Sequence, residues 1–240
     1  MTNNTPLGKL YLIPVTMGES DPMDVLPQTV KRTIELIDHY IVENEKTARK
    51  SIKGVLPEKK QSELVLFALN KHTDAKEHLS FIQPLLAGKN MGLMSEAGCP
   101  GVADPGAVIV KLAHEKGVQV IPLVGPSSIL LAMMASGMNG QSFTFNGYLP
   151  IDKGEKKSAL KNFEKLSFDK NQSQIFIETP YRNNKLLEDI LQALQPSTHL
   201  CIATDITLPT EYIKTLRVAD WKKTKVDLHN RPTIFIIHKM

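Results

Sequence analysis

The stretch L-M-S-E-A-G-C-P-G-V-A-D-P-G, which runs from Leu93 to Gly106, decides the fold predicted for this chain. The apolar residues that lead into it stop at a segment rich in glycine and proline, which is typical of a buried strand that ends in a loop. Ligands of open α/β sheets bind where such strands end, and glycine lets the backbone approach a ligand closely. The stretch therefore predicts a site that includes the carboxylates of Glu96 and Asp104.

A purely structural interpretation of the same loop stays open. Asp104 precedes Pro105, and aspartate at the N-cap followed by proline in the first helical position is a common way to begin a helix. The loop would then be a tight connection to a helix over residues 105–116. Glu96 has a similar alternative role, in which its carboxylate accepts backbone N–H groups and shapes its own loop.

Outward from this loop, short apolar runs alternate with segments of helical spacing. The expected strands are residues 10–13, 40–42, 64–69, 91–95 and 118–123. One expected helix begins at Pro27, and the other expected helices cover residues 46–53, 73–86 and 105–116. Five alternations of strand and helix predict a three-layer α/β domain with a mostly parallel sheet. We place this N-terminal domain at residues 1–124.

The pattern changes after Gly125. Residues 129–136 are almost wholly apolar, so we expect a buried helix there. The expected strands are then residues 143–149, 174–178, 199–204, 211–218 and 233–238, with helices at 156–166 and 183–194. The later strands follow one another without helices between them, which predicts antiparallel pairing and hence a mixed α/β domain over residues 125–240.

Composition sets wide limits on the function. The chain has 240 residues, of which 42% are hydrophobic, so a sizeable core is expected, and its net charge of +4 permits a polyanionic partner without requiring one. The longest apolar run, residues 129–134, is too short to span a bilayer, and the polar N-terminus has no signal-peptide pattern. Cys99 and Cys201 form no metal or redox spacing, so we expect a cytoplasmic protein without a metal site.

Several motifs resemble one known family. S-E-A-G-C-P-G-V-A-D-P-G resembles the S-D-A-G-x-P-x-x-x-D-P-G motif of the tetrapyrrole methylase superfamily, and is most similar to the branch of ribosomal small-subunit RNA cytidine 2′-O-methyltransferases. Further segments resemble this family in the same order along the chain: G-K-L-Y-L-I-P at 8–14, V-I-P-L-V-G-P-S at 120–127, F-N-G-Y-L-P at 145–150 and I-E-T-P-Y-R at 177–182.

The resemblance implies a methyltransferase that depends on S-adenosylmethionine and has two α/β domains. It also implies that the cofactor binds between the domains, that the protein is a homodimer and that the substrate is ribosomal RNA. The cofactor-binding residues that it implies are Pro14, Ala97, Gly98, Cys99, Ser127, Ser128, Glu178, Thr179 and Ala203.

The chain departs from the branch at three motifs on the expected substrate side. The family's aspartate in S-D-A-G is Glu96, its G-N is Gly18-Glu19, and its E-D-T-R is matched only loosely from Glu43 onward. Two alternatives therefore stay open. The first alternative is a C-methyltransferase that acts on a tetrapyrrole or corrin precursor. The second is a protein that binds the cofactor and has lost catalysis.

A ribose hydroxyl is a poor nucleophile until it is deprotonated, so a general base is expected. The candidates are Glu96, Asp104, Glu43 and Glu211, and Gly18 and Arg182 complete the expected substrate contacts. Two clusters of basic residues have two possible roles: they contact an RNA backbone, or they are solvated surface. Glu155 and Glu164 reduce the charge of the first cluster. The clusters are Lys153, Lys156, Lys157, Lys161 and Lys165, and Trp221 with Lys222, Lys223 and Lys225.

Overall fold

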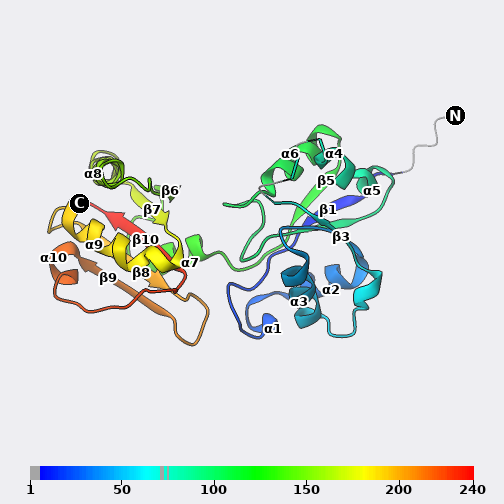
Figure 1. Ribbon diagram of the computed structural model, residues 1–240, viewed down its shortest axis with the longest axis horizontal. Helices are drawn as coiled ribbons and strands as arrows, with labels where there is room; N and C mark the ends of the chain where they lie inside the picture. Colours follow the sequence, from blue (N-terminus) through cyan, green and yellow to red (C-terminus); the bar gives the residue numbers. More distant parts are fainter. Residues whose placement is uncertain (1–5, 71–72, 75) are drawn as a thin grey trace. The chain divides into compact units, whose positions relative to one another are not determined.

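A computed structural model of the protein describes residues 6–70, 73–74 and 76–240. The chain divides into two units, Met1–Ser127 (unit 1) and Ser128–Met240 (unit 2). The boundary predicted from the sequence followed residue 124. Each unit has its own five-stranded sheet and is described by itself (Figure 1).

The sheet of unit 1 is entirely parallel. Its strands are β1 (Lys9–Leu12), β2 (His39–Val42), β3 (Val65–Ala68), β4 (Met91–Met94) and β5 (Gln119–Pro122), in the order β3-β2-β4-β1-β5. Parallel pairing brings the carboxyl ends of β1, β2 and β4 to one edge. The long loops that follow β1 and β4 therefore begin at the same edge, as the sequence predicts.

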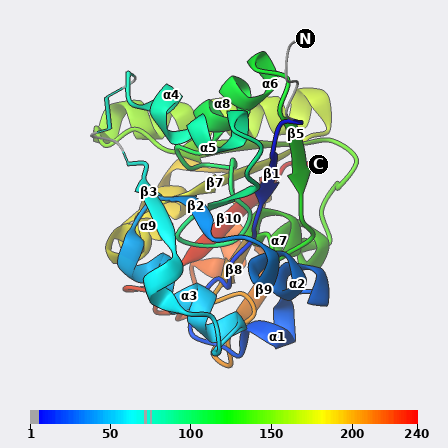
Figure 2. The same ribbon diagram turned by 90° about the vertical axis from the view of Figure 1, so that its right-hand side faces the viewer.

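Helices cover both faces of this sheet, which gives the predicted three layers (Figures 1 and 2). One face carries α1 (Pro22–Val25), α2 (Gln28–Leu36) and α3 (Glu45–Val55), and the other carries α4 (His78–Phe81), α5 (Gln83–Leu86) and α6 (Ala107–Glu115). A short 3₁₀ turn, Gln61–Glu63, precedes β3. Successive residues of β2 enter opposite cores: Tyr40 and Val42 pack with α2 and α3, and Ile41 packs with α5 and α6. Burial on both faces explains why the strands are continuously apolar.

Unit 2 has the mixed sheet that the sequence predicts. Its strands are β6 (Phe143–Tyr148), β7 (Ser173–Ile177), β8 (His199–Thr204), β9 (Tyr212–Arg217) and β10 (Thr233–His238), in the order β6-β7-β10-β8-β9. Only β6 and β7 pair in parallel, and the other three pairs are antiparallel. Because β7 and β8 both lie antiparallel to β10 and flank it, they run in the same direction and end at the same edge.

The helices of unit 2 are unequally distributed over the sheet. They are α7 (Ser128–Ser136), α8 (Lys153–Lys170), α9 (Asn183–Ala193) and α10 (Val218–Trp221), with a 3₁₀ turn at Pro180–Arg182. Leu160 of α8, Leu186 of α9 and Trp221 of α10 share one buried cluster with Phe235 of β10. The buried residues of α7 are outside this cluster, and α7 contacts β8, β9 and β10 from the other face.

Two expected helices differ from the observed ones. The segment 73–86, of which residue 75 lies outside the described residues, contains two separate short helices, α4 and α5. Pro84 lacks a backbone N–H and favours a helix start, so the chain begins a new turn at Gln83. Helix α7 was expected to be buried, but Leu130 is 53% exposed and Met134 is 77% exposed. Because nearly all residues of α7 are apolar, the sequence did not indicate which side of this helix is exposed.

None of the helices within residues 6–70, 73–74 and 76–240 is both long and apolar enough to cross a membrane.

Candidate functional site

The loops that follow β1 and β4 are joined at the carboxyl edge of the unit 1 sheet. The N–H of Val15 donates to the carbonyl of Gly98 at 3.0 Å, and the N–H of Ile13 donates to the carbonyl of Leu93 at 2.9 Å. The bond from Ile13 continues the β1–β4 pairing by one residue, and the bond from Val15 belongs to an isolated antiparallel bridge beyond the ends of both strands. The stretch from which the sequence prediction began is therefore held against the loop after β1.

A groove of about 640 Å³ opens beside this junction. The loop after β1, helix α3 and the start of the loop after β4 supply its walls. Its lining residues are Thr16, Met17, Gly18, Glu19, Ser20, Pro22, Thr47, Lys50, Ser51, Gly54, Glu96 and Ala97. Of the predicted site residues, Gly18, Glu96 and Ala97 are thus brought together. The sequence analysis missed the contribution of α3, whose residues lie far from Glu96 along the chain.

Glu96 is held at the wall of this groove by two neighbours. Its Oε1 accepts a hydrogen bond from Thr47 Oγ1 at 2.5 Å, and its backbone N–H donates to Glu43 Oε1 at 3.2 Å. The side chain is exposed. In the described part of the chain no group donates a hydrogen bond to its second carboxylate oxygen. Glu96 therefore combines a fixed position with an oxygen that is available to a ligand.

Glu43 is half-buried behind Glu96, at the end of β2. Burial raises the pKa of its carboxyl group, the hydrogen bond from Glu96 N–H lowers it, and the charges of Asp104 and Glu96 raise it. The net shift is upward from the ordinary value of 4.5. The native state therefore binds a proton to Glu43 more readily than the unfolded chain does.

Replacing Glu43 with glutamine is expected to raise the melting temperature of unit 1 at pH 7. The native state holds more protons at this group than the unfolded state, so wild-type stability falls as pH rises from 4.5 through the higher native pKa. The advantage of the variant should therefore disappear below pH 4.5. Thermal unfolding from about pH 3.5, below the ordinary pKa of a glutamate carboxyl, to about pH 8, well above it, measures this difference.

Glu19→Gln is a matched control in the same region. Lys50 hydrogen-bonds to Glu19 at 2.6 Å and holds the pKa of that carboxyl group below its usual value. The pair is fully exposed, so its loss should change stability little, and in the opposite direction. A Glu43→Gln variant that is less stable than wild type at pH 7 would contradict the assignment of Glu43.

Asp104 braces the loop rather than capping the next helix. Its Oδ2 accepts from Gly101 N–H at 2.8 Å, and its Oδ1 accepts from Gly106 N–H at 2.6 Å. Helix α6 begins at Ala107 with Gly106 as its N-cap, so the predicted start at Pro105 with Asp104 as N-cap is wrong. Burial raises the pKa of Asp104, and these two hydrogen bonds partly offset the rise. Both of its oxygens are used by its own loop.

Close packing surrounds the predicted cofactor residues of unit 1. Gly98 has a φ of +69°, and Cys99 Sγ donates to the carbonyl of Pro126 at 3.3 Å. A Cβ on Gly125 would lie 2.2 Å from Pro14 Cβ, so only glycine allows this approach to the buried proline. Of the predicted pair Ser127 and Ser128, the first ends unit 1 and the second begins α7.

The predicted cofactor residues of unit 2 lie at one edge of its sheet. Ile177 of β7 and Ala203 of β8 both pair with Ile234 of β10, one on each side. Glu178 directly follows Ile177, and its Oε1 accepts from the N–H of Thr179 at 2.7 Å. Glu178, Thr179 and Ala203 thus lie at the same edge of the sheet, at the ends of the two strands that flank β10.

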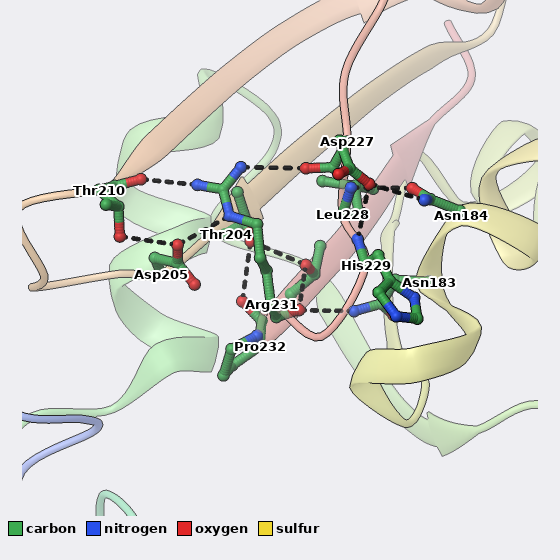
Figure 3. Close-up of polar contacts among 11 residues, drawn as sticks. Asn183, Asn184, Thr204, Asp205, Thr210, Asp227, Leu228, His229, Arg231 and Pro232 are labelled. Atoms are coloured by element: carbon green, nitrogen blue, oxygen red, sulfur yellow. Dashed lines mark hydrogen bonds and ion pairs between the residues drawn. The ribbon is translucent and has the colours of Figure 1, made fainter.

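A polar network that the sequence analysis did not anticipate fixes the loops at this edge (Figure 3). Arg231 donates from Nε to Asp205 Oδ2 at 2.8 Å, from Nη2 to the carbonyl of Thr210 at 2.7 Å and from Nη1 to the carbonyl of Asp227 at 3.1 Å. Asn184 of α9 donates to Asp227 Oδ1 at 2.8 Å. One guanidinium group therefore ties the loop after β8 to the loop before β10.

The loop after β8 has an unusual backbone. Asp205 and Thr207 have φ angles of +52° and +73°, which are uncommon for residues other than glycine and most of all for a β-branched one. Glu211, a predicted substrate contact, closes this loop by accepting from Thr207 N–H at 2.8 Å. Arg182, the other predicted contact in unit 2, lies over the ring of Tyr181 at 5.1 Å and forms no ion pair within the described residues.

Comparison with known proteins identifies the family. The model of the tetrapyrrole (corrin/porphyrin) methylases matches residues 9–221. The chain belongs to the tetrapyrrole methylase family. The expected enzyme class, a methyltransferase, is thereby confirmed.

Sequence similarity to other proteins extends over most of the chain. The protein is 29% identical over 218 residues to ribosomal RNA small subunit methyltransferase I of Vibrio cholerae, covering 91% of this chain and 71% of the relative. It is 32% identical over 188 residues to the protein of the same name from Bacillus subtilis, covering 78% of this chain and 60% of the relative.

Solved structures of this family have the same fold. The methyltransferase CobJ matches with a TM-score of 0.65 at 14% identity, over 97% of this chain and 94% of that one. Uroporphyrin-III C-methyltransferase from Thermus thermophilus, complexed with S-adenosylhomocysteine, matches with a TM-score of 0.57 at 16% identity, over 97% and 98% of the two chains. At these identities the likeness shows the fold alone.

Proposed function

We propose that this tetrapyrrole methylase transfers a methyl group from S-adenosylmethionine to a ribose 2′-hydroxyl of small-subunit ribosomal RNA. The names of its relatives support the RNA substrate. The observation that carries the mechanism is the position of Glu96, which is fixed by Thr47 and Glu43 at the wall of an open groove. The groove lies at the carboxyl edge of a parallel sheet, where α/β proteins bind their ligands.

S-adenosylmethionine supplies a methyl group on a positively charged sulfur, which needs no covalent help from the protein. The chain must therefore hold the acceptor hydroxyl in line and remove its proton. Glu96 is the general base in this proposal, since Oε1 is anchored by Thr47 and Oε2 faces no donor among the described residues. Glu43 positions Glu96 through its backbone N–H, and Asp104 holds the loop in shape.

In this proposal the loop after β4 in unit 1 contacts the methionine part of the cofactor. Ala97 is exposed and Gly98 turns the chain with positive φ, so this loop presents backbone groups rather than bulky side chains. In unit 2, Glu178, Thr179 and Ala203 are the proposed contacts to the adenosine part. Gly18, Arg182 and Glu211 stay proposed substrate contacts.

Replacing Gly98 with valine is expected to weaken binding of S-adenosylhomocysteine by at least about tenfold. The φ of +69° disfavours a β-branched residue, and a Cβ would lie 3.3 Å from the carbonyl oxygen of Pro126. Gly101→Val is the matched control, because Gly101 has a φ of +84° but no atom within 4 Å of its Cβ position. Isothermal titration calorimetry measures both. Equal losses would mean that backbone strain, and not the position of Gly98, explains the effect.

Methyl transfer with radiolabelled cofactor tests the function directly. The protein is incubated with small ribosomal subunits, with free small-subunit RNA and with a uroporphyrinogen, and label is expected on the RNA. Label on the porphyrinogen alone would contradict the RNA proposal. Absence of cofactor binding at about millimolar concentration, well above typical affinities, would contradict the proposed methyltransferase activity.

The expected homodimer and cytoplasmic location belong to this proposal too. Exposed apolar side chains on α7, Leu130 and Met134, support self-association. Light scattering coupled to size-exclusion chromatography measures the oligomeric state, and a monomer at micromolar concentration would contradict the homodimer.

A further inference from the structure

The net positive charge of the protein comes entirely from unit 2. Unit 1 has 14 Lys and Arg against 14 Asp and Glu, whereas unit 2 has 15 against 11. The whole excess of +4 therefore lies in the unit that contains helix α8. A local excess attracts polyanions more strongly than the same charge spread over the whole chain.

Helix α8 concentrates this charge on one side. Lys157, Lys161 and Lys165 are exposed, and among the described residues none of them forms an ion pair. At about 100° per residue they fall, together with Phe168, within an arc of about 80°, and each is about 6 Å further along the axis than the one before. Lys153 continues the row toward the start of the helix.

Three acidic residues of α8 lie near this row, and among the described residues none of them forms an ion pair with its lysines. Glu164 is buried, and its Oε1 accepts from Gln195 N–H at 2.8 Å and from Thr198 Oγ1. These two bonds hold the carboxylate within the unit, but Glu164 also lines the groove beside Lys161 and Lys165, so the sequence-based expectation that it dilutes the basic face stays a prediction. Glu155 lies about 80° outside the arc, and Asp169, one step of the row beyond Lys165, lies about 40° outside it. Conversely Lys156, expected to belong to the basic face, is buried and paired with Asp189 at 3.4 Å.

A groove of about 670 Å³ runs along this face. Lys161, Glu164, Lys165 and Phe168 line it from α8, and Lys239 lines it from the end of the chain. Lys239 donates to Ser197 Oγ, which positions its ammonium group, and it forms no ion pair with any residue that the structure describes. Phe168 is 62% exposed, which is unusual for a phenylalanine and places an aromatic ring beside the cations.

We propose that a single-stranded segment of the RNA substrate binds in this α8 groove and along the adjoining lysine row, with phosphates at Lys161 and Lys165 in the groove, a phosphate at Lys157 beyond it and a base stacked on Phe168. A row of cations with an interleaved aromatic ring is how proteins bind single-stranded nucleic acid. The inference rests on the proposed RNA substrate and adds a binding surface distinct from the groove that contains Glu96. The other basic group lacks the aromatic part, because Trp221 is buried and donates its Nε1–H to the carbonyl of Leu200.

Fluorescence anisotropy with a short labelled single-stranded RNA from the small subunit tests the proposal. The variant K157Q/K161Q/K165Q is expected to bind about tenfold or more weakly at low salt, and to reduce the slope of log K against log salt by about 2, as for three lost phosphate contacts. Phe168→Ala is expected to weaken binding several-fold without changing the slope. K157R/K161R/K165R keeps the charges and should bind like wild type.

K222Q/K223Q/K225Q is the matched control, since it removes the same number of exposed charges from the same unit. Its binding should weaken less than about threefold. Equal weakening by both triple variants would overturn the proposal in favour of non-specific attraction, and so would unchanged binding by the α8 triple. Stronger binding to phosphatidylserine vesicles than to RNA would also overturn it.

Methyl transfer separates this inference from the proposed function. If wild type methylates small-subunit RNA, K157Q/K161Q/K165Q should raise KM about tenfold while kcat at saturation stays within twofold, since uniform binding energy is lost. An unchanged KM overturns the role of α8 and leaves the function intact. If wild type methylates no RNA, the proposed function fails, and the anisotropy assay still decides whether α8 binds RNA.

Discussion

Replacing Glu96 with glutamine is expected to lower kcat for methyl transfer to small-subunit RNA by about 10²- to 10⁴-fold, the usual contribution of a general base. Glutamine can still accept the hydrogen bond from Thr47 that Glu96 accepts at 2.5 Å, so the loop should keep its shape. What is lost is a group able to take the hydroxyl proton. Single-turnover kinetics at saturating RNA measures the chemical step without interference from product release.

Glu19→Gln is the control for this variant too, because Glu19 lines the same groove but is paired with Lys50. Its kcat should stay within about threefold of wild type, since no catalytic group is lost. Affinity for S-adenosylhomocysteine should be unchanged in both variants. If Glu96→Gln retains wild-type kcat, Glu96 is not the base and serves only to shape the loop.

Replacing Arg231 with methionine is expected to lower the free energy of unfolding of unit 2 by about 3 kcal/mol, the usual cost of leaving a buried charge without its partner. The carboxylate of Asp205 is only 9% exposed and bonds to Arg231 at 2.8 Å. The variant also removes two hydrogen bonds to the carbonyls of Thr210 and Asp227. The loop after β8 and the loop before β10, both shown in Figure 3, are then no longer joined through the guanidinium group.

Urea unfolding followed by tryptophan fluorescence isolates this effect. Trp221 is the single tryptophan of the chain and is buried in unit 2, so its signal reports on that unit. Arg217→Met is the control, because Arg217 is exposed and forms no ion pair among the described residues. The double variant Asp205→Ala/Arg231→Met should be less destabilised than the two single changes added together. Strict additivity would show that the two side chains do not interact.

The local sequence was sufficient for the order of elements and for the loop on which the fold depends. Apolar runs interrupted by glycine and proline located β1 to β5, and their alternation with helices predicted the parallel sheet, because these patterns depend only on neighbouring residues. The motif around Gly98 indicated the family, which the match over residues 9–221 confirms.

Side-chain roles were decided only by tertiary structure. Thr47 and Glu96 are 49 positions apart, and Asp205 and Arg231 are 26 apart, so no local pattern links them. Charge read along α8 was misleading for the same reason. In the sequence Glu164 looks like an acidic surface residue, but in the structure it is buried against the segment that follows α9. Sequence periodicity specifies which face of an element is apolar, whereas the partner of a polar group depends on which distant segment packs beside it.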